Sequence, residues 1–251
     1  MKALRALFDD VLRAFGVLTR LPLPRREAHM AMQPRSVWAY PLVGAAVGAL
    51  SALIWFAAQF AGLGTPLAAG LAIAAQVLIT GALHEDGLAD FADGFGGGRD
   101  KETTLAIMRD SRIGAYGVIA LILILGLRWG GAAGLALDNV LAGLIGAALL
   151  GRLAIVALVV FLAPARGDGF GRIIAHPPRH AALAALLLGL ALVGAHMPLI
   201  TTALAFVAAA AAAGYVAIIA RRRIGGYTGD VLGAGEQLAE TAALLVFVAA
   251  A

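Results

Sequence analysis

Residues 84–112 read HEDGLADFADGFGGGRDKETTLAIMRDSR, a polar segment enclosed by long apolar runs. Seven of the fifteen acidic residues of the chain lie in it: Glu85, Asp86, Asp90, Asp93, Asp100, Glu102 and Asp110. The spacing of Asp86, Asp90 and Asp93, at i, i+4 and i+7, puts them on one face of a helix. Like charges on one face repel each other, and a divalent cation would relieve this because it prefers carboxylate oxygens. The simpler alternative, a solvated acidic loop, gives no reason for helical spacing.

The composition indicates an all-α, polytopic membrane protein. Apolar residues make up 61% of the chain and charged residues 14%, against roughly 25% charged residues in soluble domains. Several apolar runs exceed the length of about 20 residues that crosses a bilayer. We predict a single membrane-embedded domain over residues 1–251. The chain has no cysteine, which excludes disulfides and thiolate sites.

We predict about seven transmembrane helices, and the last is short enough to tilt or to pack inside the bundle. They lie near residues 38–62, 65–83, 113–130, 140–163, 181–196, 198–220 and 237–251. Residues 1–35 precede them as an amphipathic segment. Its apolar residues follow helical spacing from Leu4 to Leu18, with the charges on the other side, which is typical of a helix in the membrane interface. The pairs Gly44/Gly48 and Gly130/Gly134 predict close helix packing within the chain.

The basic residues predict the orientation. With the N-terminus inside, the cytoplasmic segments are 1–37, 84–112, 164–180 and 221–236, and they hold seventeen of the nineteen Lys and Arg residues. This bias agrees with the positive-inside rule and is interpreted as a topology signal, with no role in binding nucleic acid. Nearly all the acids lie in the same segments, so the polar chemistry is expected on the cytoplasmic face. Such an asymmetry favours an enzyme over a transporter, which would keep charges near the bilayer midplane.

Cationic and glycine-rich pieces accompany the aspartates. Gly96, Gly97 and Gly98 follow the predicted carboxylate helix and are expected to let backbone amides approach a phosphate. Asp100 is a predicted N-cap for a short helix over 101–110. That helix presents Arg109 next to Arg112, and arginines facing aspartates are typical of a site for a metal-bound pyrophosphate. A local cluster of salt bridges is the alternative.

Four more residues complete the candidate site. His84, two residues before Asp86, is a candidate base or orienting hydrogen-bond donor. Arg152 lies about halfway along a predicted span, where a guanidinium needs a structural or anionic substrate partner. Asp230 and Glu240 are expected to reach the site from a second segment.

Four motifs make the chain resemble the cobalamin synthase family, the adenosylcobinamide-GDP ribazoletransferases. They are HEDGLADFADG at 84–94 with the following glycine run, MRDSRIGAYG at 108–117, GYTGDVLGA at 226–234 and LTRLPLP at 18–24. The resemblance covers essentially the full chain, and its central motif is long and specific.

The resemblance implies a magnesium-dependent late step of vitamin B12 assembly in the bacterial inner membrane. The substrates would be adenosylcobinamide-GDP and α-ribazole or its 5′-phosphate, and GMP would leave. This implied reaction agrees with the carboxylate-rich, cytoplasm-facing site that the residues predict. We assign Asp86, Asp90 and Asp93 to Mg²⁺, with Glu85 as a weaker candidate. Arg109 and Arg112 would bind the pyrophosphate, with His84 orienting the attacking ribose hydroxyl.

Two other functions were weighed. A CDP-alcohol phosphotransferase also handles a pyrophosphate with aspartates on membrane helices, but its usual motif runs from Asp-Gly through Ala-Arg, whereas Asp90 follows Ala89 here. A corrinoid or cation transporter is disfavoured because only Arg152 is expected near the midplane. The sequence leaves open whether the chain forms a homo-oligomer.

The orientation is testable with single cysteines in this cysteine-free chain. We expect Gly97→Cys and Gly225→Cys to resist an impermeant thiol reagent in intact cells and to react in inverted membrane vesicles, because both positions lie in cytoplasmic segments. Labelling of either position from outside would show that the orientation is wrong.

Overall fold

The computed structural model describes residues 2–23, 33–166 and 174–250, which form helices and no β-strand. In chain order the elements are α1 (Lys2–Leu18), η1 (Pro34–Ala39), α3 (Tyr40–Phe60), α4 (Thr65–Thr80), α5 (Leu83–Gly97), α6 (Lys101–Ile107), α7 (Ala115–Gly134), η2 (Leu137–Asn139), α8 (Val140–Phe161), α10 (Arg179–Gly194), α11 (Leu199–Ile224) and α12 (Gly229–Ala249). A helix satisfies its backbone hydrogen bonds within itself, as a chain crossing lipid must. The predicted all-α membrane fold is confirmed. Pro24, the last residue of the N-terminal motif, lies outside the described residues.

Five helical segments of the described chain are long and apolar enough to cross a membrane. They are Pro34–Phe60, Ala115–Gly134, Leu137–Phe161, Leu199–Ile224 and Gly229–Ala249. Helices α4 and α5, bent by 88° at their junction, count as a sixth if they form one broken span. Helix α10 has only 16 residues, fewer than the about 20 that cross a bilayer. The number seven therefore stays a prediction.

The last helix corrects the predicted short span at 237–251. It begins at Gly229 and is 21 residues long, so the predicted start was wrong. The first turns of α12, from Gly229 to Glu236, lie in the predicted cytoplasmic segment 221–236. Glu236 is instead completely buried, because its charge is paired inside the bundle.

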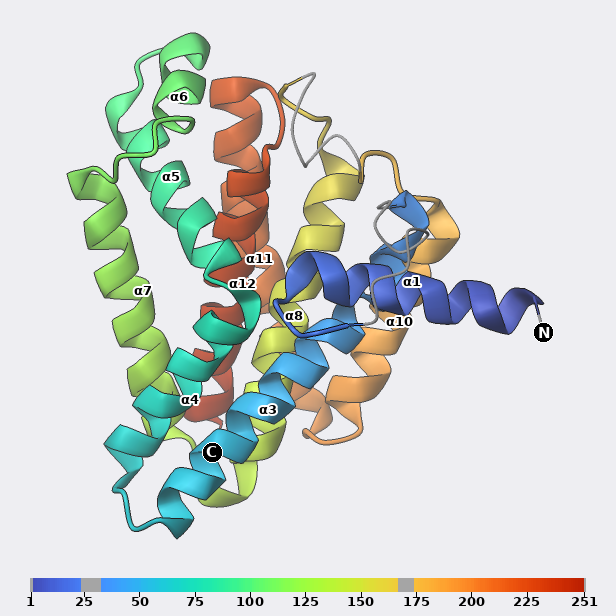
Figure 1. Cartoon of the computed structure of the whole chain (residues 1–251), viewed down its shortest axis with the longest axis vertical. Coiled ribbons are helices and arrows are strands. Elements are labelled where there is room, and N and C mark those ends of the chain that lie inside the picture. Colours follow the sequence, from blue (N-terminus) through green and yellow to red (C-terminus); the bar gives the residue numbers. More distant parts are fainter. Residues whose placement is uncertain (1, 24–32, 167–173, 251) are drawn as a thin grey trace.

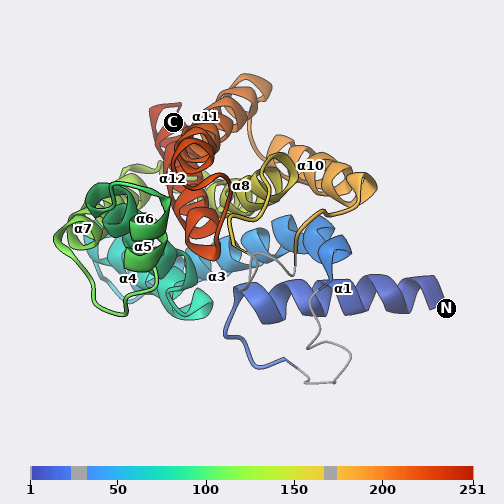
Figure 2. The same ribbon diagram turned by 90° about the horizontal axis from the view of Figure 1, so that it is seen from above.

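Helices α8 and α12 lie at the centre of the bundle, where they pack against each other. Figure 2 shows α3, α5, α7, α10 and α11 arranged around them. Helix α1 runs across the bundle, and its N-terminal end projects away from it (Figure 1). The central pair therefore presents side chains to most of the other helices, and charged groups on it can be enclosed on all sides.

The contact between α3 and α8 confirms one of the two predicted glycine pairs. A Cβ atom at Gly44 would lie 2.5 Å from the carbonyl oxygen of Ala148, and one at Gly48 would approach the backbone of Leu144 even more closely. The second pair differs, since a Cβ at Gly130 would meet nothing within 4 Å. Small residues thus permit backbone contact at the first pair only.

A sharp turn separates α4 from α5. Gly81 and Ala82 both have left-handed backbone conformations, with φ of 66° and 56°. Their amides return to the last turn of α4, where the Ala82 amide donates to the carbonyl of Val77 at 2.8 Å. The segment after α1 packs here too, since the Arg20 amide donates to the carbonyl of Ile79 at 2.7 Å. The turn directs α5 along α12, against which it packs.

Helix α1 is amphipathic as predicted, but two of its charges face the protein. Leu4 and Phe8 are 74% and 61% exposed, whereas Asp10 is 4% exposed. The Asp10 carboxylate accepts hydrogen bonds from Arg13 at 2.9 Å and Arg35 at 3.0 Å. Asp10 and Arg13 thus lie on the side opposite the exposed apolar residues, as predicted, and the contact between Asp10 and Arg35 attaches this side of the helix to the bundle.

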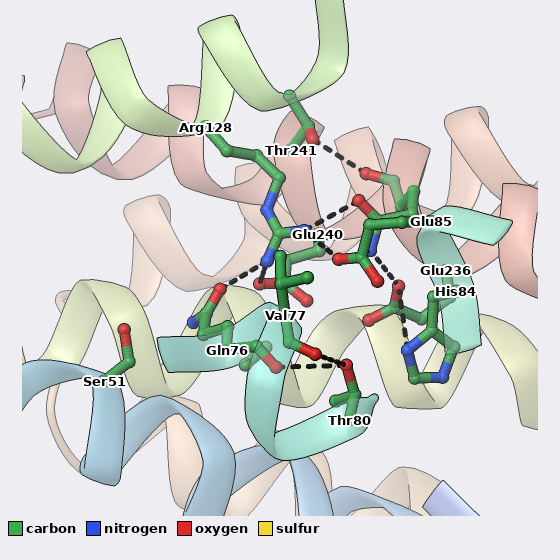
Figure 3. A network of polar contacts seen from close by, with 12 residues as sticks. Ser51, Gln76, Val77, Thr80, His84, Glu85, Arg128, Glu236, Glu240 and Thr241 are labelled. Atoms are coloured by element: carbon green, nitrogen blue, oxygen red, sulfur yellow. Dashed lines mark hydrogen bonds and ion pairs between the residues drawn. The ribbon is translucent and has the colours of Figure 1, made fainter. Parts of the chain in front are cut away.

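A buried ionic network crosses the bundle, and Arg128 of α7 is one of its two cations (Figure 3). Its guanidinium donates to Glu85 at 3.1 Å and to Glu240 at 2.8 Å. It also donates to two amide oxygens, those of Gln76 on α4 and Gln237 on α12. One side chain therefore connects α4, α5, α7 and α12.

Arg152 of α8 is the second cation of the network. It pairs with Glu236 at 2.5 Å and with Glu240 at 2.6 Å, and it donates to the carbonyl of Ala148 at 3.1 Å. Glu240 thus bridges both guanidiniums. We use the name ionic network for Arg128, Arg152, Glu85, Glu236 and Glu240, all of which are at most 5% exposed.

The glycine contact predicts a stability effect. Gly48→Ala should destabilise the protein by about 1–3 kcal/mol, because the new methyl group overlaps the backbone of α8. Gly126→Ala is the matched control, since a Cβ there meets nothing within 4 Å and alanine favours helix formation. Thermal unfolding in detergent measures both. Equal melting temperatures for the two variants would contradict the close contact of α3 and α8.

The ionic network predicts a larger effect on stability. Arg152→Met should destabilise the fold by about 3–5 kcal/mol, because it leaves the buried carboxylate of Glu236 without its arginine partner. Arg221→Met removes the same charge from an exposed position at the end of α11, and should change the melting temperature little. Equal melting temperatures for Arg152→Met and Arg221→Met would contradict a stabilising role of the ionic network.

Candidate active site

The site forms where α5 crosses α12 at two glycines. A Cβ atom at Gly87 would lie 3.1 Å from the Cα of Asp230, and one at Gly233 would lie 3.0 Å from the carbonyl oxygen of His84. A side chain at either glycine would separate the helices. Because they touch, Asp86 of α5 lies beside Asp230 of α12, and both line the same cavity.

That cavity has a volume of about 230 Å³. Four of its lining residues carry polar side chains: Tyr40, His84, Asp86 and Asp230. Asp86 is exposed and Asp230 partly exposed, whereas Tyr40 and His84 are 1% and 2% exposed. The carboxylates therefore mark the mouth of the cavity, and the phenol and imidazole lie deeper. We call it the α5–α12 cavity.

The predicted carboxylate helix is confirmed as α5, and the fold adds a fourth aspartate to its three. Asp90 has Asp86, Asp93 and Asp230 as electrostatic neighbours. Asp230 follows the N-cap of α12, Thr228, whose hydroxyl donates to the Asp230 carboxylate at 3.1 Å and accepts from the amide of Val231. The prediction that Asp230 approaches the aspartates from a second segment is thus supported by the geometry.

Asp93 differs from the other aspartates because its carboxylate caps another helix. It accepts hydrogen bonds from the amides of Gly114 at 2.7 Å and Gly117 at 2.9 Å. These glycines lie at the start of α7, where free amides carry partial positive charge. A Cβ at either glycine would lie within 2.5 Å of the carboxylate oxygens. The MRDSRIGAYG motif therefore holds α7 against α5.

The aspartate carboxylates suit a hard divalent cation, but they do not surround a metal position completely. Within the described residues, no three His, Cys, Asp or Glu side chains converge closely enough to hold a metal ion. Asp86 and Asp90 make no hydrogen bond or ion pair to the described part of the chain. Mg²⁺ usually takes one or two protein carboxylates and completes its shell with water and substrate phosphates. Two free carboxylates fit that chemistry, whereas Asp93 is engaged by amides.

The glycine run corrects the predicted phosphate loop. Gly96 and Gly97 belong to the last turn of α5, and Gly98 is its C-cap. A Cβ at Gly98 would lie 2.3 Å from the hydroxyl of Thr104, and one at Gly96 would overlap the ring of Tyr116. These glycines admit neighbouring elements, so a loop placed for an anion is not what the structure shows.

Arg223 holds the end of α5. Its guanidinium donates to the carbonyl of Phe95 at 2.9 Å and to that of Gly98 at 2.8 Å. These are carbonyls of the last turn, which lack partners within a helix. The basic end of α11 therefore has a structural contact in addition to its value as a topology signal.

The short helix α6 begins as predicted. Asp100 accepts a hydrogen bond from the amide of Thr103 at 2.8 Å, and the Thr103 hydroxyl completes a capping box. These hydrogen bonds lower the pKa of the exposed Asp100 carboxyl. The helix ends at Ile107, so Arg109 lies just beyond it, exposed to solvent.

Arg112 does not lie with the aspartates of α5. Its guanidinium binds Asp110 at 2.6 Å, and its side chain is 87% exposed. The hydrogen bonds from Arg112 hold the pKa of Asp110 down at about 2. For Arg112 the local salt bridge, weighed above as the alternative, is what the structure shows. Solvent screening makes such a surface pair weak.

Arg166 is the cation that the sequence reasoning missed. It is an electrostatic neighbour of both Asp90 and Asp230, and it donates to the carbonyl of Leu105 in α6 at 3.2 Å. It follows α8 in a segment tied to the start of α12, where the amide of Ala165 donates to the carbonyl of Tyr227 at 2.8 Å. Its position next to a glycine was the only sequence signal.

Three predicted site residues belong to the ionic network. Glu85, the weaker metal candidate, faces Arg128, and Arg152 and Glu240 pair with each other. The structure favours a structural partner for Arg152 over a substrate anion. His84 joins this group to the cavity, since its Nδ1 lies 3.8 Å from the Glu236 carboxylate (Figure 3).

The network also corrects the expectation that polar chemistry gathers on one face. Only Arg152 is expected deep in the bundle from the sequence, yet Arg128 and three glutamates are buried there as well. The signal was present, because isolated charges in apolar helices are costly and need a partner. The absence of midplane charges therefore cannot be used against a transporter.

Comparison with known proteins resolves the class. A family profile described as cobalamin-5-phosphate synthase matches residues 10–248. An adenosylcobinamide-GDP ribazoletransferase of Sinorhizobium sp. is 43% identical, with 94% of each chain covered. Proteins of the same name from Bradyrhizobium diazoefficiens and Ralstonia nicotianae are 40% and 39% identical, covering 99% of this chain and 96% and 98% of their own. No solved structure matches. The chain is an enzyme that belongs to the cobalamin-5-phosphate synthase family.

Proposed function

We propose that the enzyme transfers a cobinamide phosphate from adenosylcobinamide-GDP to α-ribazole or α-ribazole 5′-phosphate. A ribose hydroxyl oxygen forms a bond to the phosphorus next to cobinamide, and the bond from that phosphorus to the bridging oxygen of the pyrophosphate breaks. GMP leaves, and the hydroxyl proton passes to a base or to water. The product is adenosylcobalamin or its 5′-phosphate.

One observation in the fold supports this proposal most directly. Asp86 and Asp230, from two helices far apart in sequence, meet at the mouth of a small cavity that is otherwise largely apolar. Phosphate transfer needs little covalent help from the protein and depends on positioning and charge stabilisation. A carboxylate pair at the mouth provides hydrogen-bond acceptors for a hydroxyl and ligands for a cation, while the cavity excludes water.

Mg²⁺ is the proposed cofactor, held by Asp86 and Asp90 with help from Asp230. When bound, the ion would offset the charge of the pyrophosphate and of the leaving GMP. Asp93 and Glu85, which the sequence also predicts as metal ligands, are left out of the metal site. In the present proposal Asp93 positions α7 against the site, and Glu85 holds Arg128 at the base of α5.

The cationic part of the site is proposed to be Arg166 with Arg109. Arg166 is already an electrostatic neighbour of Asp90 and Asp230, and Arg109 lies at the solvent-exposed end of α6. Guanidiniums bind phosphate oxygens through paired, charge-assisted hydrogen bonds. Arg112 and Gly96–Gly98 are left out of substrate binding, since each has a local structural role.

The proposed location is the bacterial inner membrane with the aspartates facing the cytoplasm, where a nucleotide-linked substrate is available. The basic residues at the end of α11 support this orientation, because positive charges favour the cytoplasmic side. The full-length family match disfavours both a CDP-alcohol phosphotransferase and a transporter.

An assay with matched aspartate variants tests the proposal. Membranes containing the enzyme, supplied with adenosylcobinamide-GDP, α-ribazole and Mg²⁺, should release GMP. We expect Asp86→Asn and Asp230→Asn each to lower kcat by at least about 100-fold, the size of losing one electrostatic group at a reacting centre. Asp138→Asn is the matched control and should retain full activity, because Asp138 is exposed and does not line the α5–α12 cavity.

Two results would contradict the proposal. Release of no GMP by the folded wild type would show that the reaction is wrong. Near-normal rates in both site variants would show that the carboxylates of the α5–α12 cavity take no part in it.

A further inference from the structure

The interior of the α5–α12 cavity contains polar atoms that make no hydrogen bond within the described part of the chain. The hydroxyl of Tyr40 and both ring nitrogens of His84 are buried without a hydrogen-bond partner in the described part of the chain. Leaving a buried hydroxyl or ring nitrogen unsatisfied costs free energy. Such groups beside a cavity indicate a ligand that supplies the missing partners.

The size of the cavity limits what enters. Its volume of about 230 Å³ lies below the range of about 300–1,000 Å³ that encloses drug-sized ligands. It is too small for a corrin macrocycle and suits one flat, two-ring base. The corrin part of the donor must therefore lie outside, beyond the carboxylates at the mouth.

The chemistry of the walls discriminates between two such bases. Most of the other lining side chains are aliphatic, among them Leu18 of α1 and Ile155 of α8. Guanine would bring several donors and acceptors along its edge, and two buried polar groups cannot satisfy them all. A benzimidazole base in a riboside has an apolar benzene edge and a single free ring nitrogen that accepts one hydrogen bond.

From this match we propose that the α5–α12 cavity binds the benzimidazole base of the acceptor nucleoside. Tyr40 donates its hydroxyl to the free ring nitrogen, and His84 lines the same deep part of the cavity. The inference rests on the proposed function, because that reaction supplies a benzimidazole riboside as acceptor.

The arrangement also orients the nucleophile. With the base enclosed beside Tyr40, the ribose lies toward the mouth, where Asp86 and Asp230 accept hydrogen bonds from its hydroxyls. The attacking oxygen then faces the phosphates at the open side. Tyr40 and His84 are in this sense binding and positioning groups for the acceptor.

The first experiment removes the hydroxyl that is proposed to donate to the ring nitrogen of the base. Tyr40→Phe should raise the KM for α-ribazole by about 2- to 10-fold, the size of one neutral hydrogen bond, and leave the KM for adenosylcobinamide-GDP unchanged. Tyr215→Phe, at a position 60% exposed on α11, is the matched control and should change neither constant.

A comparison of two ribosides tests whether Tyr40 contacts the free ring nitrogen. The wild type should bind benzimidazole riboside about 2- to 10-fold more tightly than indole riboside, which has a carbon in place of the free nitrogen. Tyr40→Phe should abolish this preference. Calorimetry with the riboside alone measures binding on the purified full chain, so the outcome does not depend on turnover.

A second variant fills the cavity in case Tyr40→Phe does not fold. Gly229 lines the cavity, and a Cβ there meets nothing within 4 Å. Gly229→Leu should weaken riboside binding by at least 10-fold, whereas Gly214→Leu, with equally open space on α11, should not.

Two results would overturn the inference. If the variants raise the KM for adenosylcobinamide-GDP or weaken GMP binding, the cavity holds guanine. If they leave every constant unchanged while the wild type releases GMP, the acceptor binds elsewhere although the proposed function holds. A wild type that binds the riboside and releases no GMP would leave the cavity assignment standing and contradict the reaction.

Discussion

Pairing of charge in a medium without water is the constraint on which this structure depends. Arg128 and Arg152 lie inside the bundle, where a guanidinium is costly unless carboxylates and carbonyls surround it. Glu240 bridges both, and Glu85 brings α5 to the same point. Because Glu85 is next to Asp86 in the chain, the network also sets where the Asp86 carboxylate emerges beside α12.

Most of the helices, and the helical spacing of the α5 aspartates, could be predicted because these features are local. Helical periodicity and helix caps can be recognised from residues close together in the sequence, as the capping box from Asp100 to Thr103 shows. The ionic network could not be derived this way, since Arg128 and Glu240 are 112 residues apart. The late predicted start of α12 has the same cause: Glu236 looks like a surface residue until its partner Arg152 is placed.

The candidate site was predicted in part for similar reasons. Asp86 and Asp90 were identified from spacing alone, but their neighbours depend on which helices cross. Arg112 illustrates the difficulty, because the acid it binds is two residues away and a local partner is formed before any distant one. Arg166 had only a neighbouring glycine to mark it, and the sequence did not mark Tyr40 as a site residue. Only the fold shows that they lie near the aspartates and the α5–α12 cavity.

The order of synthesis gives the ionic network a consequence for membrane insertion. The ribosome completes α7 and α8 with their arginines well before Glu240 exists, since Arg152 precedes it by 88 residues. Glu85 is made earlier still, but it reaches only one of the two guanidiniums. Neither of the carboxylates that pair with Arg152 therefore exists when α8 is synthesised. The charge pairing inside the bundle is thus completed only by α12, which carries Glu236 and Glu240.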